Sequence, residues 1–228
     1  MRLSISMTKK EQLFGWLFMI AQLSVLPVLL NLLNLVLPVP LNLSSLNFLM
    51  FVTNFCLCIG IFYRFLGKSA QMAAANPFRC LRFAALGLGL YYVGSFLVGM
   101  LIGALELDFF NANDNAILSM AAENYGLIAF GTVFLVPVAE ETLYRGLLFQ
   151  GIHSKSRIGA YALSVTVFGL IHISGYIGSV SLPILALSFL QYVPAGLSLA
   201  WAYEKTDSIW VPILMHMTIN QVSISLMG

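Results

Sequence analysis

Charged residues are scarce in this 228-residue sequence. Asp, Glu, Lys and Arg make up only 9% of it, whereas hydrophobic residues make up 60%, and the mean hydropathy is +0.91. Soluble domains average about 25% charged residues. The scarcity of charge therefore argues against a large soluble domain and indicates a membrane protein that crosses the bilayer several times.

Cysteine is also rare. The three cysteines, Cys56, Cys58 and Cys80, lie in or beside apolar runs. Their odd number and the lack of a metal-ligand spacing argue against a disulfide framework or a zinc knuckle, so we expect three buried, small apolar side chains. A convincing small-residue cleavage site is missing too, and the first apolar run is long for a signal peptide. We therefore expect that run to remain as a spanning helix.

Long apolar runs are abundant. A spanning helix needs about 20 mostly apolar residues, and seven segments reach that length. The fold class that we predict is all-α, a polytopic transmembrane bundle of about seven helices. The predicted spans are residues 13–37, 46–66, 83–105, 125–150, 159–178, 183–202 and 209–227.

The basic residues predict the orientation of this bundle. With seven spans and a cytoplasmic N-terminus, every Lys and Arg except Arg145 falls in a cytoplasmic segment. The longest loop on the other side, within residues 106–123, carries only acidic charges. This distribution is typical of the excess of positive charge in cytoplasmic loops. We expect a multi-pass protein of the cell membrane with its N-terminus in the cytoplasm and its C-terminus outside.

A few polar side chains interrupt the predicted spans of the second half of the chain. Ionisable residues within a membrane are costly and usually face a cavity or one another. Residues four apart share one face of a helix, which pairs Glu141 with Arg145, and His216 with Asn220. The candidate functional residues are Glu140, Glu141, Arg145, His172, His216 and Asn220.

The depths of three of these residues are similar. At 1.5 Å per residue, Glu140, His172 and His216 lie roughly 15, 20 and 10 Å from the cytoplasmic ends of their helices. In a hydrocarbon core about 30 Å thick, all three fall near the middle. We therefore expect a carboxylate and two imidazoles to converge on a hydrated pocket that opens towards the cytoplasm, the composition of a hydrolytic or metal site.

Each polar residue also has a purely structural interpretation. Glu141 and Arg145 could form no more than a buried ion pair that fixes one helix. Glu140 has no evident partner of its own, and this favours a role as a general base. His153 lies in the basic stretch HSKSR, and we expect it to be a solvated loop residue.

Three short motifs resemble those of a known family. The stretch EETLYR, residues 140–145, resembles the EExxxR motif of the CPBP family, the CAAX proteases and bacteriocin-processing proteins, which is also called Abi. FGLIH, residues 168–172, and HMTIN, residues 216–220, resemble its FxxxH and HxxxN motifs. The resemblance covers roughly residues 120–225. It suggests N-terminal transmembrane helices over 1–120 and a catalytic helical region over 121–228.

The resemblance implies an intramembrane endopeptidase that cleaves a membrane-associated peptide or protein. It assigns Glu140 as the base that activates water and His172 as the residue that holds this water or moves its proton. His216 and Asn220 would stabilise the oxyanion, while Glu141 and Arg145 would support the site.

The cofactor expectation is either none or zinc. If a metal were bound, Glu140, His172 and His216 would hold it, but the HExxH pattern of ordinary zinc peptidases is absent. The expected partners are membrane lipid and a peptide substrate, with no nucleic acid.

Two other functions fit the residues without the resemblance. A non-catalytic immunity factor or transporter subunit could use the buried polar residues as packing contacts. An ion-coupled transporter could use them as a proton path, but the internal repeat expected of many transporters is missing.

Overall fold

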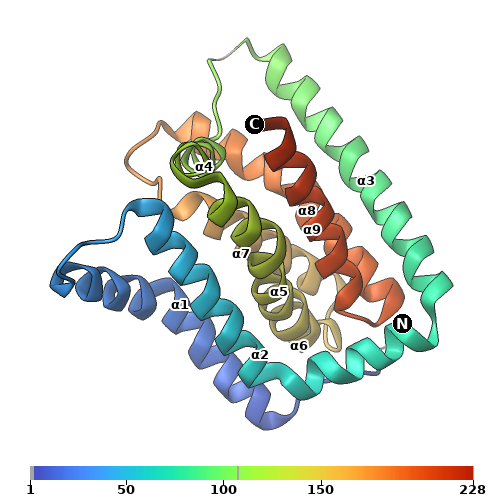
Figure 1. Cartoon of the computed structure of the whole chain (residues 1–228). Coiled ribbons are helices and arrows are strands. Elements are labelled where there is room, and N and C mark those ends of the chain that lie inside the picture. Colours follow the sequence, from blue (N-terminus) through green and yellow to red (C-terminus); the bar gives the residue numbers. More distant parts are fainter. Residues whose placement is uncertain (1–2, 107, 228) are drawn as a thin grey trace.

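The computed structural model describes residues 3–106 and 108–227, and these fold into a bundle of helices (Figure 1). The only β pairing in this part of the chain is an isolated bridge between Ile177 and Val180. The elements are α1 (Lys9–Val36), α2 (Leu43–Ala75), α3 (Pro77–Ala104), α4 (Ala112–Phe130), η1 (Gly131–Leu135), α5 (Val136–Glu141), η2 (Thr142–Phe149), α6 (Gln150–His153), α7 (Arg157–Ser174), α8 (Leu182–Thr206) and α9 (Trp210–Met227). The expectation of an all-α membrane bundle is confirmed.

Local sequence signals explain where several helices begin and end. Thr8 caps α1 through a capping box, in which its side chain accepts from the Glu11 backbone N–H and the Glu11 carboxylate accepts from the Thr8 N–H. These bonds satisfy donors that the first turn leaves free. At the other extreme, Asp207 ends α8 in the left-handed region at φ 54°. Asp tolerates this conformation better than most residues, and it lets the chain reverse into α9.

The helical rod from α4 to α6 is the central element of the bundle. It is continuous over Ala112–His153, with a kink at Asn124 (φ −151°, ψ 85°) and two π-helical stretches, η1 and η2. In Figure 1 the part before this kink is seen nearly end-on, whereas the rest descends through the bundle. The predicted span 125–150 corresponds to the descending part.

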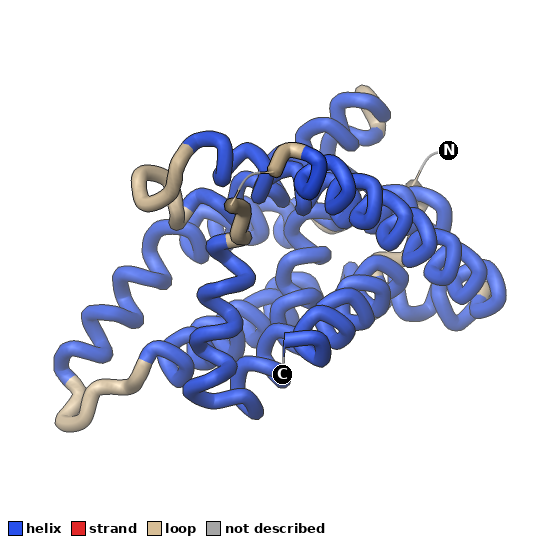
Figure 2. The backbone as a smooth tube through the Cα atoms, turned by 90° about the horizontal axis from the view of Figure 1, so that it is seen from above, coloured by secondary structure: helices blue, strands red, loops and turns tan. Residues whose placement is uncertain are grey.

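The helices differ in how much of their surface the protein covers. In the most apolar 18-residue stretch of α2, and in that of α3, 11% of the stretch is buried. In the most apolar 18-residue stretch of the α4–α6 rod, 56% is buried. Figure 1 shows α1 and α3 on opposite flanks of the rod. The apolar outer faces of α1–α3 match a lipid environment. Counting α4–α6 as one rod, the described residues form seven helical rods, which are joined by short connections (Figure 2).

Six of these rods are long and apolar enough to cross a membrane: α1, α2, α3, the α4–α6 rod, α7 and α8. Helix α9 occupies the seventh predicted position, but His216, Asn220 and Gln221 lower its mean hydropathy. These same polar side chains make it a wall of the candidate site. The chain is therefore a multi-pass membrane protein.

The cysteines follow the prediction only in part. Cys58 and Cys80 are buried, whereas Cys56 is exposed on the surface of α2. The expectation that all three are buried is therefore wrong for Cys56. A small, weakly polar thiol is compatible with a lipid-facing position, so the apolar run around it did not distinguish the two faces of the helix.

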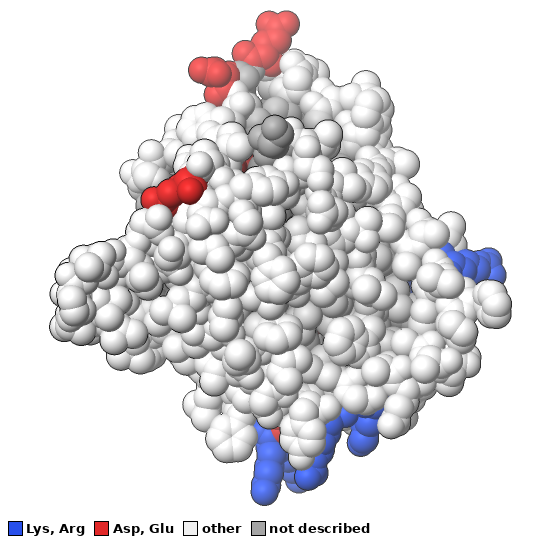
Figure 3. Space-filling view, viewed as in Figure 1, with Lys and Arg blue, Asp and Glu red and all other residues white. Residues whose placement is uncertain are grey.

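Acidic and basic side chains occupy different ends of the bundle. Figure 3 shows Asp and Glu at one end, and Lys and Arg at the opposite end and on one flank. Glu106 and Asp108 lie in the connection before α4, and Glu123 lies beside the kink of α4. We refer to these two ends as the acidic end and the basic end.

We predict that the acidic end faces away from the cytoplasm. In a background where Cys56, Cys58 and Cys80 are replaced by Ala, the variant Asp108→Cys should react with a membrane-impermeant maleimide in intact cells. Lys155→Cys should react only after permeabilisation, because basic loops remain in the cytoplasm. Both positions are exposed. The opposite labelling pattern would contradict the proposed orientation.

Candidate active site

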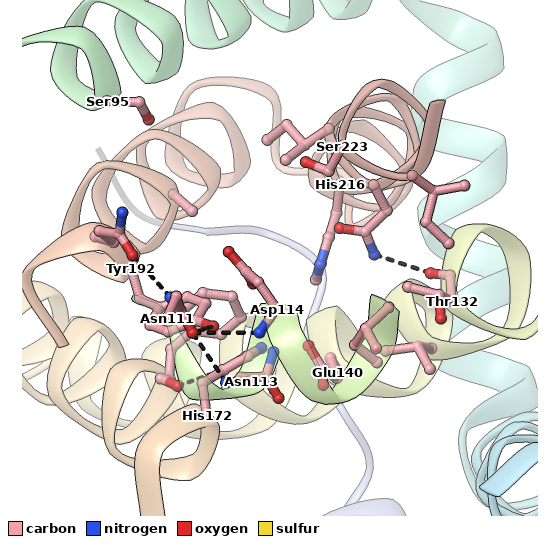
Figure 4. A pocket seen from close by; sticks show the side chains of 18 of the residues that line it. Ser95, Asn111, Asn113, Asp114, Thr132, Glu140, His172, Tyr192, His216 and Ser223 are labelled. Atoms are coloured by element: carbon pink, nitrogen blue, oxygen red, sulfur yellow. Dashed lines mark hydrogen bonds between the residues drawn. The ribbon is translucent and has the colours of Figure 1, made fainter. Parts of the chain in front are cut away.

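A cavity of about 380 Å³ lies among α3, α4, α5, α7, α8 and α9 (Figure 4). Such a volume is ample for several water molecules. Four of the six candidate residues line it: Glu140, His172, His216 and Asn220. The other two, Glu141 and Arg145, are fully buried behind its wall. The structure thus brings the carboxylate, both imidazoles and the amide to one space, while the catalytic roles of these residues stay predictions.

Glu140 lies on α5 and faces this cavity. Its Oε2 atom is buried and has no hydrogen-bond partner among the described residues. Glu140 also lines a second, smaller cavity of about 170 Å³, which is bounded by α1, α2, α5, η2 and α7. A buried carboxylate oxygen without a partner is costly, so this oxygen is free to accept a hydrogen bond from a water molecule or a substrate.

Glu141 joins two other candidate residues. Its Oε1 accepts a hydrogen bond from Arg145 Nη1 at 2.8 Å and lies 2.9 Å from His216 Nδ1. Arg145 also stacks over the Phe168 ring, with its Cζ 4.5 Å from the ring centroid, and reaches the Gly196 carbonyl at 3.4 Å. One carboxylate therefore ties the rod to α9, and its guanidinium partner ties the rod to α7 and α8.

The partners of the two imidazoles determine their tautomers. A carboxylate paired with Arg is ionised and can only accept, so the His216 Nδ1 atom carries the proton. The His172 Nδ1 atom lies 2.8 Å from the Phe168 carbonyl oxygen, which also only accepts. Both neutral rings therefore leave Nε2 unprotonated and available as an acceptor.

Aromatic rings hold the imidazoles in place. Phe168 packs against both, with centroid separations of 4.6 Å to His172 and 5.9 Å to His216. His172 also packs on Tyr192 of α8 at 4.3 Å. The FxxxH motif places Phe168 one turn before His172, and the Phe168 ring packs against both histidines.

Asn220 is positioned by the irregular helix opposite it. Its Nδ2 atom donates to the Thr132 carbonyl at 2.8 Å, and Thr132 lies in η1 (Figure 4). Single π-helical turns shift the backbone hydrogen bonds and are frequent at functional sites. The second N–H of the amide is not needed for this contact and can serve another acceptor.

The zinc alternative does not fit the described residues. No group of three His, Cys, Asp or Glu side chains within 3–106 and 108–227 is arranged to hold a metal ion. The set Glu140, His172 and His216 shares a cavity, and the engaged Nδ1 atoms would leave Nε2 for a metal, but these three side chains do not form such a group. No step of the proposed reaction therefore passes through a metal.

The cavity extends towards the acidic end of the bundle and not towards the basic end. Its lining includes Asn111, Asn113 and Asp114 at the start of α4, and none of the basic connections after α2, α6 or α8. The expectation of a pocket opening at the basic end is therefore wrong. Depth along the helices does not determine which end of a cavity the neighbouring helices leave open.

The polar stretch FNANDN, residues 110–115, supplies the cavity residues that sequence reasoning missed. It stands out in an apolar chain, but a polar segment between two spans is usually a solvated loop. Here it starts α4 and folds over the site. Its density of Asn and Asp beside the membrane was the signal that could have indicated this placement.

His153 was also misjudged. Its side chain is only 6% exposed, and its Nε2 atom lies 2.8 Å from Glu204 Oε1. Arg157 and Tyr161 bind the same carboxylate. This second polar cluster ties the α6–α7 turn to α8, and a buried acid on α8 explains why His153 is not solvated.

Comparison with known proteins identifies the half of the chain that contains the site. Residues 122–222 match the family model described as type II CAAX prenyl endopeptidase Rce1-like, and this span contains all six candidate residues. This match supports a CAAX protease-like family for the part of the chain that contains the site.

A curated relative supports this assignment. The chain is 25% identical over 136 residues to the "Putative membrane peptidase YdiL" of Bacillus subtilis (strain 168). The match covers 57% of this chain and 50% of that protein, so the chain spans about half of the relative's length. No solved structure matches the chain.

We predict that the Glu141–Arg145 pair stabilises the CAAX protease-like region. Removing one member of a buried ion pair leaves an uncompensated charge and costs about 3–5 kcal/mol. Glu141→Gln should therefore lower the thermal unfolding midpoint in detergent, and Glu141→Gln combined with Arg145→Met should recover part of the loss. The exposed Asp108→Asn is the matched control. If Glu141→Gln unfolds at the same temperature as this control, the pair is not structural.

Proposed function

We propose that this protein is an intramembrane endopeptidase that hydrolyses a peptide bond in a membrane-associated protein or peptide. The observation that carries the proposal is the presence of Glu140, His172, His216 and Asn220 around one cavity that is large enough for several water molecules. Amide hydrolysis needs a base and donors aimed at the developing oxyanion. The matched family supports the same class of reaction.

The first step is the attack of water on the scissile carbonyl. The free Oε2 of Glu140 accepts a proton from a water molecule in the cavity. The unprotonated Nε2 of His172 accepts a second hydrogen bond and orients this water. The water oxygen bonds to the carbonyl carbon, and a tetrahedral oxyanion forms.

Stabilisation of this oxyanion falls to Asn220, whose free amide N–H can donate directly. The neutral His216 ring, held at Nδ1 by Glu141, presents Nε2 only as an acceptor. It therefore helps His172 to orient the attacking water and does not donate to the oxyanion. Glu140 then passes the proton to the leaving nitrogen, the C–N bond breaks, and the products are a carboxylate and an amine.

The physiological setting follows from the same proposal. CAAX-type processing, maturation of a peptide or bacteriocin, and self-immunity against one are the settings that the family resemblance suggests. Each requires a substrate that reaches a site within the membrane, and the extension of the cavity towards the acidic end favours a substrate segment on that side.

Glu140→Gln should abolish cleavage while the protein still inserts and folds. Loss of a general base lowers rates by about 10²–10⁴-fold. The measurement is a comparison of new peptide termini in membranes from cells that produce the wild type or this variant, followed by assay of the cleaved sequences as synthetic peptides with purified protein. Glu123→Gln, an exposed change at the acidic end, is the matched control. Equal cleavage by Glu140→Gln and wild type would exclude the proposal.

The same synthetic peptides test the metal-free mechanism. We expect cleavage by purified protein to survive a strong chelator, because the described residues offer no three-ligand site. Activity that is lost on chelation and restored by zinc would contradict the metal-free mechanism. The proposal that the protein is a peptidase would remain.

A further inference from the structure

Asp114 places a second carboxylate on the wall of the candidate active site. It lies in the first turn of α4 and lines the same cavity as Glu140. Figure 4 shows both residues beside the cavity, with His172 and His216 around the same space. Asp114 is itself half-buried.

The charge of the cavity is unbalanced. Its lining contains two carboxylates, Asp114 and Glu140, and neither Lys nor Arg. Arg145 is engaged with Glu141 behind the wall. Among the described residues no ion pair is formed by Asp114 or Glu140, and the Oε2 atom of Glu140 is buried without a partner. With neutral imidazoles, the cavity is therefore an anionic compartment that a cationic group would complement.

Asp114 is held in place by its neighbours. The Asn111 side-chain oxygen accepts from the backbone N–H groups of Asn113 and Asp114, at 3.0 and 3.3 Å. The Asn111 amide in turn donates to Gln191 Oε1 of α8 at 2.7 Å, and Tyr192 donates to Asn111 at 3.4 Å. The first turn of α4 is thus fastened to α8, so the Asp114 carboxylate is preorganised and is not on a free loop.

We propose that Asp114 determines specificity by binding a cationic group of the peptide substrate, either a Lys or Arg side chain or a free amino terminus. This inference rests on the proposed peptidase function and adds the chemical class of its substrate. Charge pairs in a partly desolvated cavity are stronger than in water. The exposed acidic residues around the start of α4 have the sign needed to attract such a substrate.

The test measures binding, so that it does not depend on turnover. The protein is the full chain carrying Glu140→Gln, in nanodiscs, which leaves Asp114 as the only carboxylate on the cavity wall. The probes are three fluorescent single-span peptides that differ only in the segment that would meet the acidic end. One has an internal Lys and an acetylated terminus, one has Gln instead, and one has Gln with a free amino terminus.

We expect at least one cationic peptide to bind about five- to tenfold more tightly than the neutral peptide, which corresponds to roughly 1–1.4 kcal/mol. Asp114→Asn should remove this preference, whereas Asp108→Asn, an exposed change outside the cavity, should leave it intact. Comparison of the Lys peptide with the free-terminus peptide identifies which cation is used.

Several outcomes would overturn the inference. These are equal binding of all three peptides, binding of none of them, or a preference that survives Asp114→Asn. If Asp114→Asn fails to fold, Asp114→Glu replaces it and should retain a preference, because the charge is kept. A purely structural Asp114 would change stability but not the ratio between cationic and neutral peptides. The proposed peptidase function is judged separately, by the cleavage assay on Glu140→Gln.

Discussion

The buried carboxylate of Glu141 is the contact on which the site depends. It pairs with Arg145 one turn along the same rod and fixes the His216 ring of α9 at 2.9 Å. Because Arg145 is fully buried and also stacks on Phe168, the pair connects four helices through two charges. Breaking such a pair costs far more than a surface ion pair, and here the loss would also release a cavity residue.

The irregular backbone of the central rod is the second constraint. The π-helical stretches η1 and η2 flank α5, the short segment that carries Glu140 and Glu141. Adjacent positions on a helix point about 100° apart, so one glutamate faces the cavity while the next faces the buried pair. The Thr132 carbonyl in η1 binds Asn220, so this irregularity also positions an amide from another helix.

The sequence predicted the architecture well because each part of it depends on local composition. Among the described residues, six helical rods lie where apolar runs of spanning length occur, and α9 lies at the seventh predicted position. The charge asymmetry of the loops matches the two ends of the bundle. The sequence also indicated which motif residues lie on one helix face, such as Glu141 and Arg145, because spacing within a helix determines which side chains share a face. Glu140, His172 and His216 line one cavity, as counting residues along their helices led us to expect.

The remaining features depend on contacts between distant segments, and local patterns do not reveal them. The direction of the cavity follows from the start of α4, which folds over the site after the kink at Asn124. His153 is buried because Glu204 faces it from α8. Both features depend on contacts between residues that are far apart in the chain. The composition of residues 110–115 and of the stretch around His153 does not distinguish these segments from solvated loops.

The protonation of His216 tests the central claim most directly, since the account requires Glu141 to hold its Nδ1–H so that Nε2 faces the cavity. The measurement is nitrogen NMR of protein labelled with ¹⁵N-histidine, at neutral pH, with His216 assigned by substitution. We expect His216 to carry its proton on Nδ1, and Glu141→Gln to weaken this tautomer preference. A neutral His216 protonated on Nε2 in the wild type, unaffected by Glu141→Gln, would contradict the account.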